Sequence, residues 1–362
     1  MAKINQLQIY MLYSLYLFTS TIGFLIGPII KKSHYSSWVS IFIGAILGLI
    51  LTYGSFLLAM RRPTQFFSSY GKKIMGRWIH YPLMVFMIFA ILCIAAFILR
   101  ELQDLVIQVY LPDTPQWAVS SLFGICIAYA VRSGIESIFR AAQGIFFFTI
   151  AGILFIPFIV SKEINYDMAI AFLNHMELAG ITNGSFLIAS LFGEMAFIVF
   201  VMPYIISNEK TMKSLTWATI TSIFIILANL LPVILVFGPE LPSNLTYPEF
   251  ELLRFAKTST FLENLDPLLI AIWLSSLFIK ISLLIFAATA GLTHIFSLKD
   301  HKPFSFVITA LVVGLSLTIV RTQTELNHLL EHGWIPFVLI SETIPLFYLL
   351  VDWLRSLLVK RS

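Results

Sequence analysis

Long apolar runs constrain this chain more than any other feature of its sequence. A helix needs about 20 mainly apolar residues to cross roughly 30 Å of hydrocarbon. Ten segments meet this requirement, and they lie near residues 8–30, 37–60, 80–99, 115–131, 138–160, 184–206, 214–237, 266–289, 304–320 and 334–354. We therefore predict an all-α integral membrane protein with ten transmembrane helices.

The composition supports this fold class and excludes several others. Apolar residues make up 59% of the 362 residues and charged residues 12%, against about 45–50% and about 25% in soluble domains. A soluble core of this size cannot cover so much apolar surface. A soluble enzyme, a disordered chain and a disulfide-stapled secreted domain are excluded. We predict a lipid bilayer as the surroundings, no nucleic-acid partner, no enzymatic activity, no catalytic residue, no metal ligand and no cofactor.

The distribution of lysine and arginine predicts the orientation. With a cytoplasmic N-terminus, fifteen of these residues fall in inner segments and seven, including Arg100, in outer loops, as the positive-inside rule requires. Both termini of this multi-pass chain are then cytoplasmic, and the first apolar segment is a retained helix rather than a signal peptide. The two longest outer loops are 161–183 and 238–265. We expect the second to enter as an extended segment and to continue as a short amphipathic helix after Pro248. Residues 1–362 form one membrane domain.

Two apolar segments carry helix breakers in corresponding places. Gly23, followed by Gly27 and Pro28, lies in the first segment, and Gly193 lies in the sixth. The two glycines are 170 residues apart, and each opens a group of five segments. This spacing predicts a 5+5 inverted repeat, with a first repeat over about 8–160, a second over about 184–354, and broken helices 1 and 6.

A break at mid-membrane frees backbone groups that need partners. Freed N–H groups suit a carboxylate and freed C=O groups suit an ammonium group or a cation, so a zwitterionic amino acid satisfies both. The alternative is that these small residues only let helices pack closely. The predicted substrate-binding residues are Ser20, Thr21, Gly23, Leu191, Phe192, Gly193 and Glu194.

Three ionisable residues lie well inside apolar segments: Glu194, Lys280 and Glu342. Charges in a membrane are costly and usually face a partner or water. Lys280 can replace a cotransported cation, or it can form a structural ion pair with Glu194 or Glu342. Glu194 can hold a substrate ammonium group, accept a proton that couples transport, or bond the unwound backbone. Glu342 precedes Pro345, and it can bond a helix kink there.

Tryptophans near the ends of the apolar segments are interpreted as interfacial anchors rather than as ligand contacts. They are Trp38, Trp78, Trp117 and Trp334. Their amphipathic rings favour the headgroup level of a bilayer. We therefore expect none of them in the binding site.

Several motifs resemble the spore-germination permease-like family. The matching residues are Ile4 to Gln8, Gly23, Gly27-Pro28, Phe237-Gly238, Tyr247 to Arg254, Phe261 to Pro267, Trp273 and Phe278 to Ser282. The length and the layout of ten spans also agree with that family over the whole chain.

The resemblance implies a function and a fold. It implies a B subunit of a spore germinant receptor in the spore inner membrane, which binds an amino acid or similar germinant and works with A and C subunits. It also implies membership of the amino acid–polyamine–cation superfamily, a leucine-transporter-type fold, and unwound segments at Thr21 to Gly23 and Phe192 to Glu194. Lys280 falls where sodium-coupled members have hydroxyl ligands, which argues against sodium coupling. The alternatives are a secondary amino acid transporter, with proton coupling through Glu194, and a subunit of an ion or water pathway.

Overall fold

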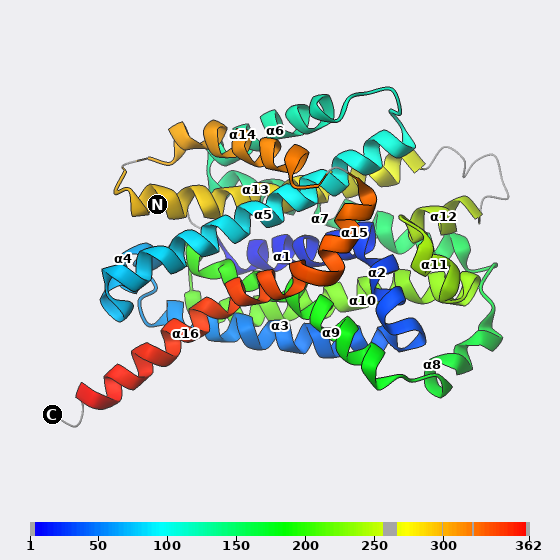
Figure 1. The fold of residues 1–362 in the computed structure, drawn as a ribbon, viewed down its shortest axis with the longest axis horizontal. Coiled ribbons are helices and arrows are strands. Elements are labelled where there is room, and N and C mark those ends of the chain that lie inside the picture. The colour runs from blue at the N-terminus through cyan, green and yellow to red at the C-terminus, as the bar shows by residue number, and fades with distance from the viewer. Residues whose placement is uncertain (1–3, 256–265, 299, 321, 360–362) are drawn as a thin grey trace.

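The computed structural model describes residues 4–255, 266–298, 300–320 and 322–359, which form helices joined by short connections (Figure 1). The first half contains α1 (Gln6–Ser20), η1 (Thr21–Leu25), α2 (Ile26–Ser33), η2 (His34–Ser36), α3 (Ser37–Met60), α4 (Phe67–Met75), α5 (Arg77–Val109), α6 (Gln116–Ser133), α7 (Ile135–Val160), η3 (Tyr166–Ile170) and α8 (Ala171–Asn174). The second half contains α9 (Leu178–Phe192), η4 (Gly193–Phe200), η5 (Met202–Tyr204), η6 (Asn208–Lys210), α10 (Thr211–Phe237), α11 (Glu240–Asn244), α12 (Pro248–Phe255), α13 (Asp266–Ile295), α14 (Lys302–Thr318), α15 (Gln323–Leu329), η8 (Leu330–Trp334) and α16 (Ile335–Val359).

Seven helical stretches within the described residues are long and apolar enough to cross a membrane. The longest, Gln6–Met60, contains α1, α2 and α3. Two further predicted segments fall on α6 and on the shorter apolar helix α14. The chain is a multi-pass membrane protein, while the number of ten crossings and the inverted repeat stay predictions.

The long helices run roughly along the longest axis of the molecule, with different connections at its two ends (Figure 1). One end carries α8, α11 and α12 and is called the α11 end here; the other carries α4 and the end of α16 and is called the α4 end. The backbone N–H of Ile4 donates to the carbonyl of Tyr204 at 3.0 Å, and the Tyr204 ring contacts that of Phe66, just before α4. The start and finish of the described chain therefore lie at the same end, as an even number of crossings requires.

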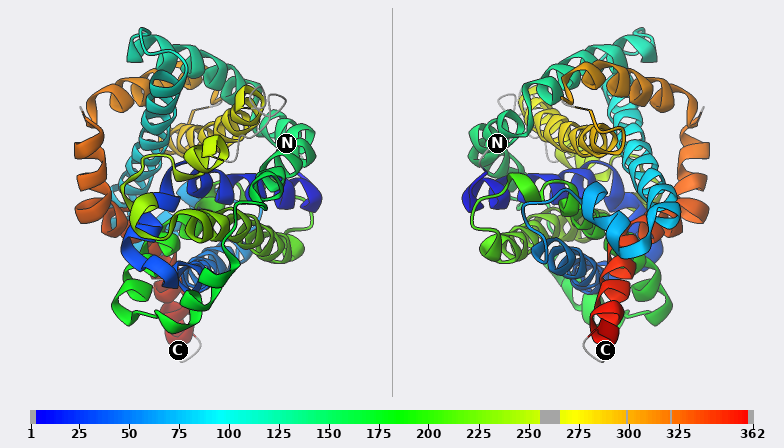
Figure 2. Two further views of the ribbon diagram at one scale, coloured as in Figure 1. Left: turned by 90° about the vertical axis from the view of Figure 1, so that its right-hand side faces the viewer. Right: turned by 90° about the vertical axis from the view of Figure 1, so that its left-hand side faces the viewer.

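Helix α1 forms the centre of the molecule (Figure 2). It packs against α10, α7 and α13, and α3 packs against α9 and η4. Almost every residue of α1 from Gln8 onward is buried, which is typical of a helix enclosed by others on all sides. Large apolar side chains on peripheral helices are exposed instead, for example Leu122, Phe147 and Phe158. This distribution suits a chain whose outer surface contacts lipid.

The two predicted breaks are changes of helix type rather than unwound segments. Helix α1 passes through the π-helical turn η1 into α2, and α9 passes into the 3-10 segment η4 at Gly193. A π turn adds a residue to the turn, and a 3-10 turn tightens it, so both shift backbone groups out of the α-helical pattern. The predicted unwinding at Thr21 to Gly23 and at Phe192 to Glu194 is therefore wrong, because the chain stays helical there. The backbone does depart from α-helical geometry at both predicted positions.

Two predicted loop features are also corrected. Helix α5 continues to Val109, so Arg100 is buried inside a helix rather than placed in an outer loop, and its Nε lies 2.8 Å from Oδ2 of Asp104. A buried partner in the next turn lets a charged residue stay within the protein. The predicted extended start of 238–265 is the short helix α11, whereas the expected amphipathic helix is present as α12. The motif residues Phe261 to Leu265 lie outside the described residues.

Candidate functional site

A small central cavity lies between the two changes of helix type. Its volume is about 30 Å³, and its walls come from α1, η1, α5, α9, η4 and η8. The polar lining side chains are Ser20, Ser190 and Glu194. The apolar lining residues are Phe24, Leu25, Ile94, Phe97, Ile98, Leu187, Leu191, Leu330 and Trp334. The cavity therefore combines one carboxyl and two hydroxyl groups with an apolar surface.

Three of the seven predicted binding residues line this cavity: Ser20, Leu191 and Glu194. The hydroxyl of Ser190 donates to the carbonyl of Leu187 at 2.8 Å, whereas the buried Ser20 hydroxyl has no hydrogen-bond partner among the described residues. The hydroxyl of Ser20 is thus free to bind a ligand or water.

The other four predicted residues lie beside the cavity rather than in its wall. The hydroxyl of Thr21 donates to the carbonyl of Leu17 at 3.3 Å, and Phe192 is fully buried where α3 approaches at Gly48. Gly23 faces a second cavity, and Gly193 packs against Glu342. Their positions fit support of the helix geometry better than direct contact with a ligand.

Trp273 of α13 occupies the space beside Gly23. A Cβ atom at Gly23 would clash with the Trp273 ring, so the close approach requires glycine. The ring Nε1–H donates to the carbonyl of Thr19 at 2.9 Å in a buried contact. That carbonyl precedes the π turn, and an unsatisfied buried carbonyl is costly. The tryptophan therefore provides a partner for the backbone at the point where helix 1 changes type.

The three ionisable residues predicted inside the membrane meet at one buried cluster. Nζ of Lys280 lies 2.9 Å from Oε2 of Glu194, an ion pair between α13 and η4. The same Nζ lies 4.3 Å from the centre of the Tyr16 ring, a distance that permits a cation–π contact. Oε2 of Glu342 lies against Gly193, where a Cβ atom would clash with it. Neither carboxylate oxygen of Glu342 has a hydrogen-bond partner within the described chain.

The cluster resolves one alternative left open by the sequence. Lys280 forms its ion pair with Glu194, while Glu342 lies against Gly193. Two carboxyl groups and one ammonium group are therefore buried together, and Glu194 also lines the central cavity. A site with this composition can take up one further positive charge, either a proton or a cation.

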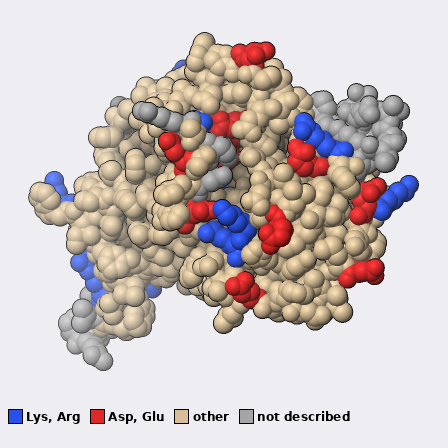
Figure 3. Space-filling model, turned by 45° about the vertical axis from the view of Figure 1, so that its right-hand side comes forward, with Lys and Arg blue, Asp and Glu red and all other residues tan. Residues whose placement is uncertain are grey.

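A polar vestibule lies next to the cavity on the side of the α11 end. Its volume is about 480 Å³, and Phe24 and Leu330 line both spaces, so they separate one from the other. Nζ of Lys31 in α2 lies 2.6 Å from Oε1 of Glu331 in η8 at its wall. Figure 3 shows acidic and basic side chains close together on the face turned toward this end. Phe24 and Leu330 therefore lie between the vestibule and the central cavity, and the Lys31–Glu331 ion pair joins α2 to η8 at the vestibule wall.

Sequence reasoning missed most of the cavity wall. Trp334, predicted as an interfacial anchor, lines the cavity and stacks on Phe97 with ring centroids 4.6 Å apart. No local signal separates this tryptophan from the exposed Trp78 and Trp117, since all three lie near helix ends. Their different roles follow from which helices surround them.

The sequence as a whole matches a known family. Residues 3–326 match the spore permease family, which is described as "Spore germination protein". The chain belongs to this family. Among curated relatives, Spore germination protein XB of Bacillus anthracis is 24% identical over 315 residues, which cover 86% of each chain. Spore germination protein KB of Bacillus subtilis (strain 168) is 24% identical over 325 residues, covering 87% of this chain and 86% of the relative.

The fold of this chain resembles solved transporter structures. MhsT in complex with L-phenylalanine superposes with a TM-score of 0.73 at 11% identity, covering 96% of this chain and 98% of that one. A Na⁺-coupled sialic acid symporter gives a TM-score of 0.66 at 12% identity over 93% of this chain and 79% of the symporter. Mhp1, a nucleobase-cation symporter, gives a TM-score of 0.61 at 14% identity over 94% of this chain and 77% of Mhp1. These likenesses establish a leucine-transporter-type fold.

Proposed function

We propose that this chain is the B subunit of a spore germinant receptor, placed in the spore inner membrane with both termini in the cytoplasm. In this role it binds a small germinant in the central cavity and signals through A and C subunits to start germination. The observation that carries the proposal is the position of Ser20, Ser190 and Glu194 around one cavity between the two modified helices of a spore permease. In this role the chain acts as a receptor subunit and not as an enzyme.

The lining favours an amino acid with an apolar side chain as the germinant. The carboxyl of Glu194 suits the ammonium group, and the hydroxyl of Ser20, which has no partner among the described residues, suits the carboxylate. Rings such as Phe97 and Trp334 suit the side chain. A cavity of about 30 Å³ holds only two or three water-sized groups. Binding therefore requires Phe24, Leu330 or Trp334 to move, and this movement is the change that partner subunits would sense.

The test is to reconstitute the purified chain in liposomes and to measure binding and uptake of labelled amino acids in one preparation. Saturable binding without accumulation is expected. Ser190→Leu should abolish binding because it fills the cavity. The matched control is Thr182→Leu on the same helix, where an exposed hydroxyl donates in the same way, to the carbonyl of Ala179 at 2.8 Å. Binding that Ser190→Leu leaves intact would contradict the proposed site.

A secondary amino acid transporter is the second candidate. It is favoured by the ionisable Glu194, which lines the cavity and also contacts Lys280, so that its charge can link substrate to a proton. Accumulation of labelled amino acid above the bound amount, driven by a proton gradient, would establish it. A response that requires the A and C subunits, with no accumulation, would establish the receptor.

A further inference from the structure

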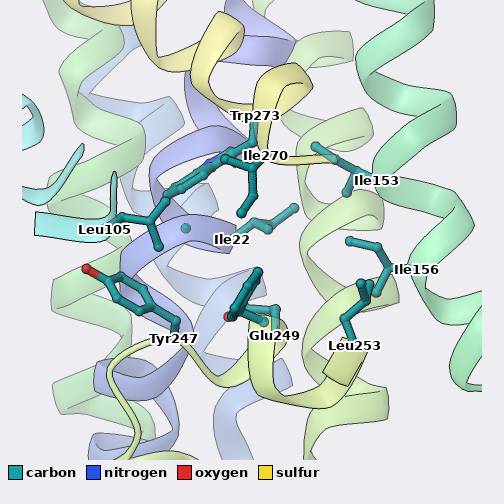
Figure 4. A pocket seen from close by; sticks show the side chains of 11 residues that line it. Ile22, Leu105, Ile153, Ile156, Tyr247, Glu249, Leu253, Ile270 and Trp273 are labelled. Atoms are coloured by element: carbon teal, nitrogen blue, oxygen red, sulfur yellow. The ribbon is translucent and has the colours of Figure 1, made fainter. Parts of the chain in front are cut away.

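A second cavity lies behind helix 1, on the side away from the central site. It has a volume of about 80 Å³ and is lined by residues of α12, α7, α5 and α13. Figure 4 shows Tyr247, Glu249 and Leu253 on one side of it, opposite Ile270 and Trp273. Its remaining lining residues are Ile22, Gly23, Leu105, Ile153, Ile156 and Phe250. The germinant site proposed above uses none of these residues.

Glu249 places a carboxyl group in this apolar lining. The residue is 7% exposed, and its Oε1 has no hydrogen-bond partner among the described residues. The buried hydroxyl of Tyr247 likewise has no partner within the described chain. Burial raises the pKa of the Glu249 carboxyl well above its ordinary value. An unpaired polar group in such surroundings is costly unless a partner arrives, so the cavity has an unfilled polar position.

The lining defines the chemistry of that partner. Every other named side chain of the cavity except that of Tyr247 is apolar, so a ligand must be mainly apolar. None of the described lining residues is cationic, and a buried carboxyl group in such a lining is best satisfied by a charged N–H donor. We propose that this cavity binds an apolar primary amine, with the alkyl chain against Trp273 and Ile153 and the ammonium group paired with Glu249.

The size of the cavity limits the length of the amine. A volume of about 80 Å³ holds roughly five to eight water-sized groups. A short alkylamine such as n-pentylamine, with about six non-hydrogen atoms, fits this range. The occupant would touch Trp273, whose Nε1–H bonds to Thr19 of helix 1.

The test is to titrate n-pentylamine, and 1-pentanol as its neutral counterpart, into the purified full-length chain in lipid nanodiscs, with empty nanodiscs as the blank. Saturable binding of the amine is expected, with pentanol weaker by at least about tenfold, because the alcohol lacks the charge-assisted bond. Glu249→Gln should reduce amine affinity by a similar factor. Glu251→Gln is the matched control, since this exposed neighbour pairs with Arg254 at 3.2 Å and should leave the affinity unchanged.

Two further variants keep the proposal falsifiable if Glu249→Gln fails to fold. Leu253→Trp should abolish amine binding, because the indole fills the cavity. Ser190→Leu, which fills the central cavity, should leave amine binding unchanged, so the two sites can fail separately. Equal affinity for amine and alcohol, an amine affinity insensitive to Leu253→Trp, or loss of amine binding in Ser190→Leu would each overturn the proposal.

Discussion

Lys280 and Glu194 join α13 to η4 at the buried centre of the protein, with Nζ and Oε2 2.9 Å apart. The Lys280 side chain is fully buried, and that of Glu194 is 7% exposed. Glu194 also forms part of the central cavity. The pair therefore connects the wall of the candidate binding site to a helix that does not line it.

We predict that Lys280→Met destabilises the protein strongly. The substitution leaves Glu194 without its cation and with Glu342 nearby, and breaking a buried pair costs about 3–5 kcal/mol. Thermal unfolding in detergent, with exposed Lys210→Met as the control, measures the change. The double variant Lys280→Met/Glu194→Gln should recover part of the loss, because one buried carboxylate is removed. A Lys280→Met protein as stable as the wild type would contradict a structural role for the pair.

We predict that Gly23→Ala lowers the free energy of unfolding by about 1–3 kcal/mol, the usual cost of overpacking. The added Cβ atom clashes with Trp273 and displaces its bond to the Thr19 carbonyl. Gly144→Ala is the control, since that glycine lies in α7 with no described neighbouring atom within 4 Å of an added Cβ. Denaturant unfolding of both variants gives the comparison. Equal effects of the two substitutions would show that the Trp273 contact does not matter.

We predict that Glu331→Gln changes ligand kinetics more than stability. The Lys31 and Glu331 side chains are 56% and 35% exposed, and exposed pairs contribute about 0–1 kcal/mol. Both association and dissociation of a germinant should become faster, because the pair holds α2 and η8 together at the vestibule wall. Rapid-mixing binding experiments at low and at high salt measure this, and high salt should reproduce the effect in the wild type. Rates that neither the variant nor salt alters would exclude the pair as a barrier.

We predict that stability falls as pH rises above the ordinary glutamate pKa of 4.5, because of Glu249. Burial raises the pKa of this carboxyl in the folded state, so the folded protein retains a proton that the unfolded chain has lost. Its stabilising contribution is complete below the unfolded pKa and is lost progressively as pH rises toward the folded pKa. Melting temperatures of the wild type, Glu249→Gln and Glu251→Gln across this range measure the effect. The fall of the melting temperature with rising pH should be smaller than in the wild type only in Glu249→Gln. An unchanged pH dependence in that variant would contradict this account.

The sequence was sufficient for the class of the protein and for the location of its unusual backbone. Apolar run length is a local property, and each of the ten predicted segments falls on helical structure. Gly23 and Gly193 likewise mark two of the changes of helix type, because glycine combined with hydroxyl residues weakens an α-helix locally. The π turn η8 between α15 and α16 was not predicted. The form of these changes was not predictable, since Trp273, which packs beside Gly23 and bonds the Thr19 carbonyl, lies 250 residues later in the sequence.

The sequence alone determined an all-helical membrane protein and three cavity residues, Ser20, Leu191 and Glu194, whereas tertiary structure decided the rest of the site. Only the packing of α13 against η4 selects Glu194 over Glu342 as the partner of Lys280. Only the approach of η8 to α5 turns Trp334 into a cavity wall. The physical reason is that lipid and protein interior are equally apolar. A membrane helix therefore carries no hydropathy pattern that reveals which of its faces meets another helix.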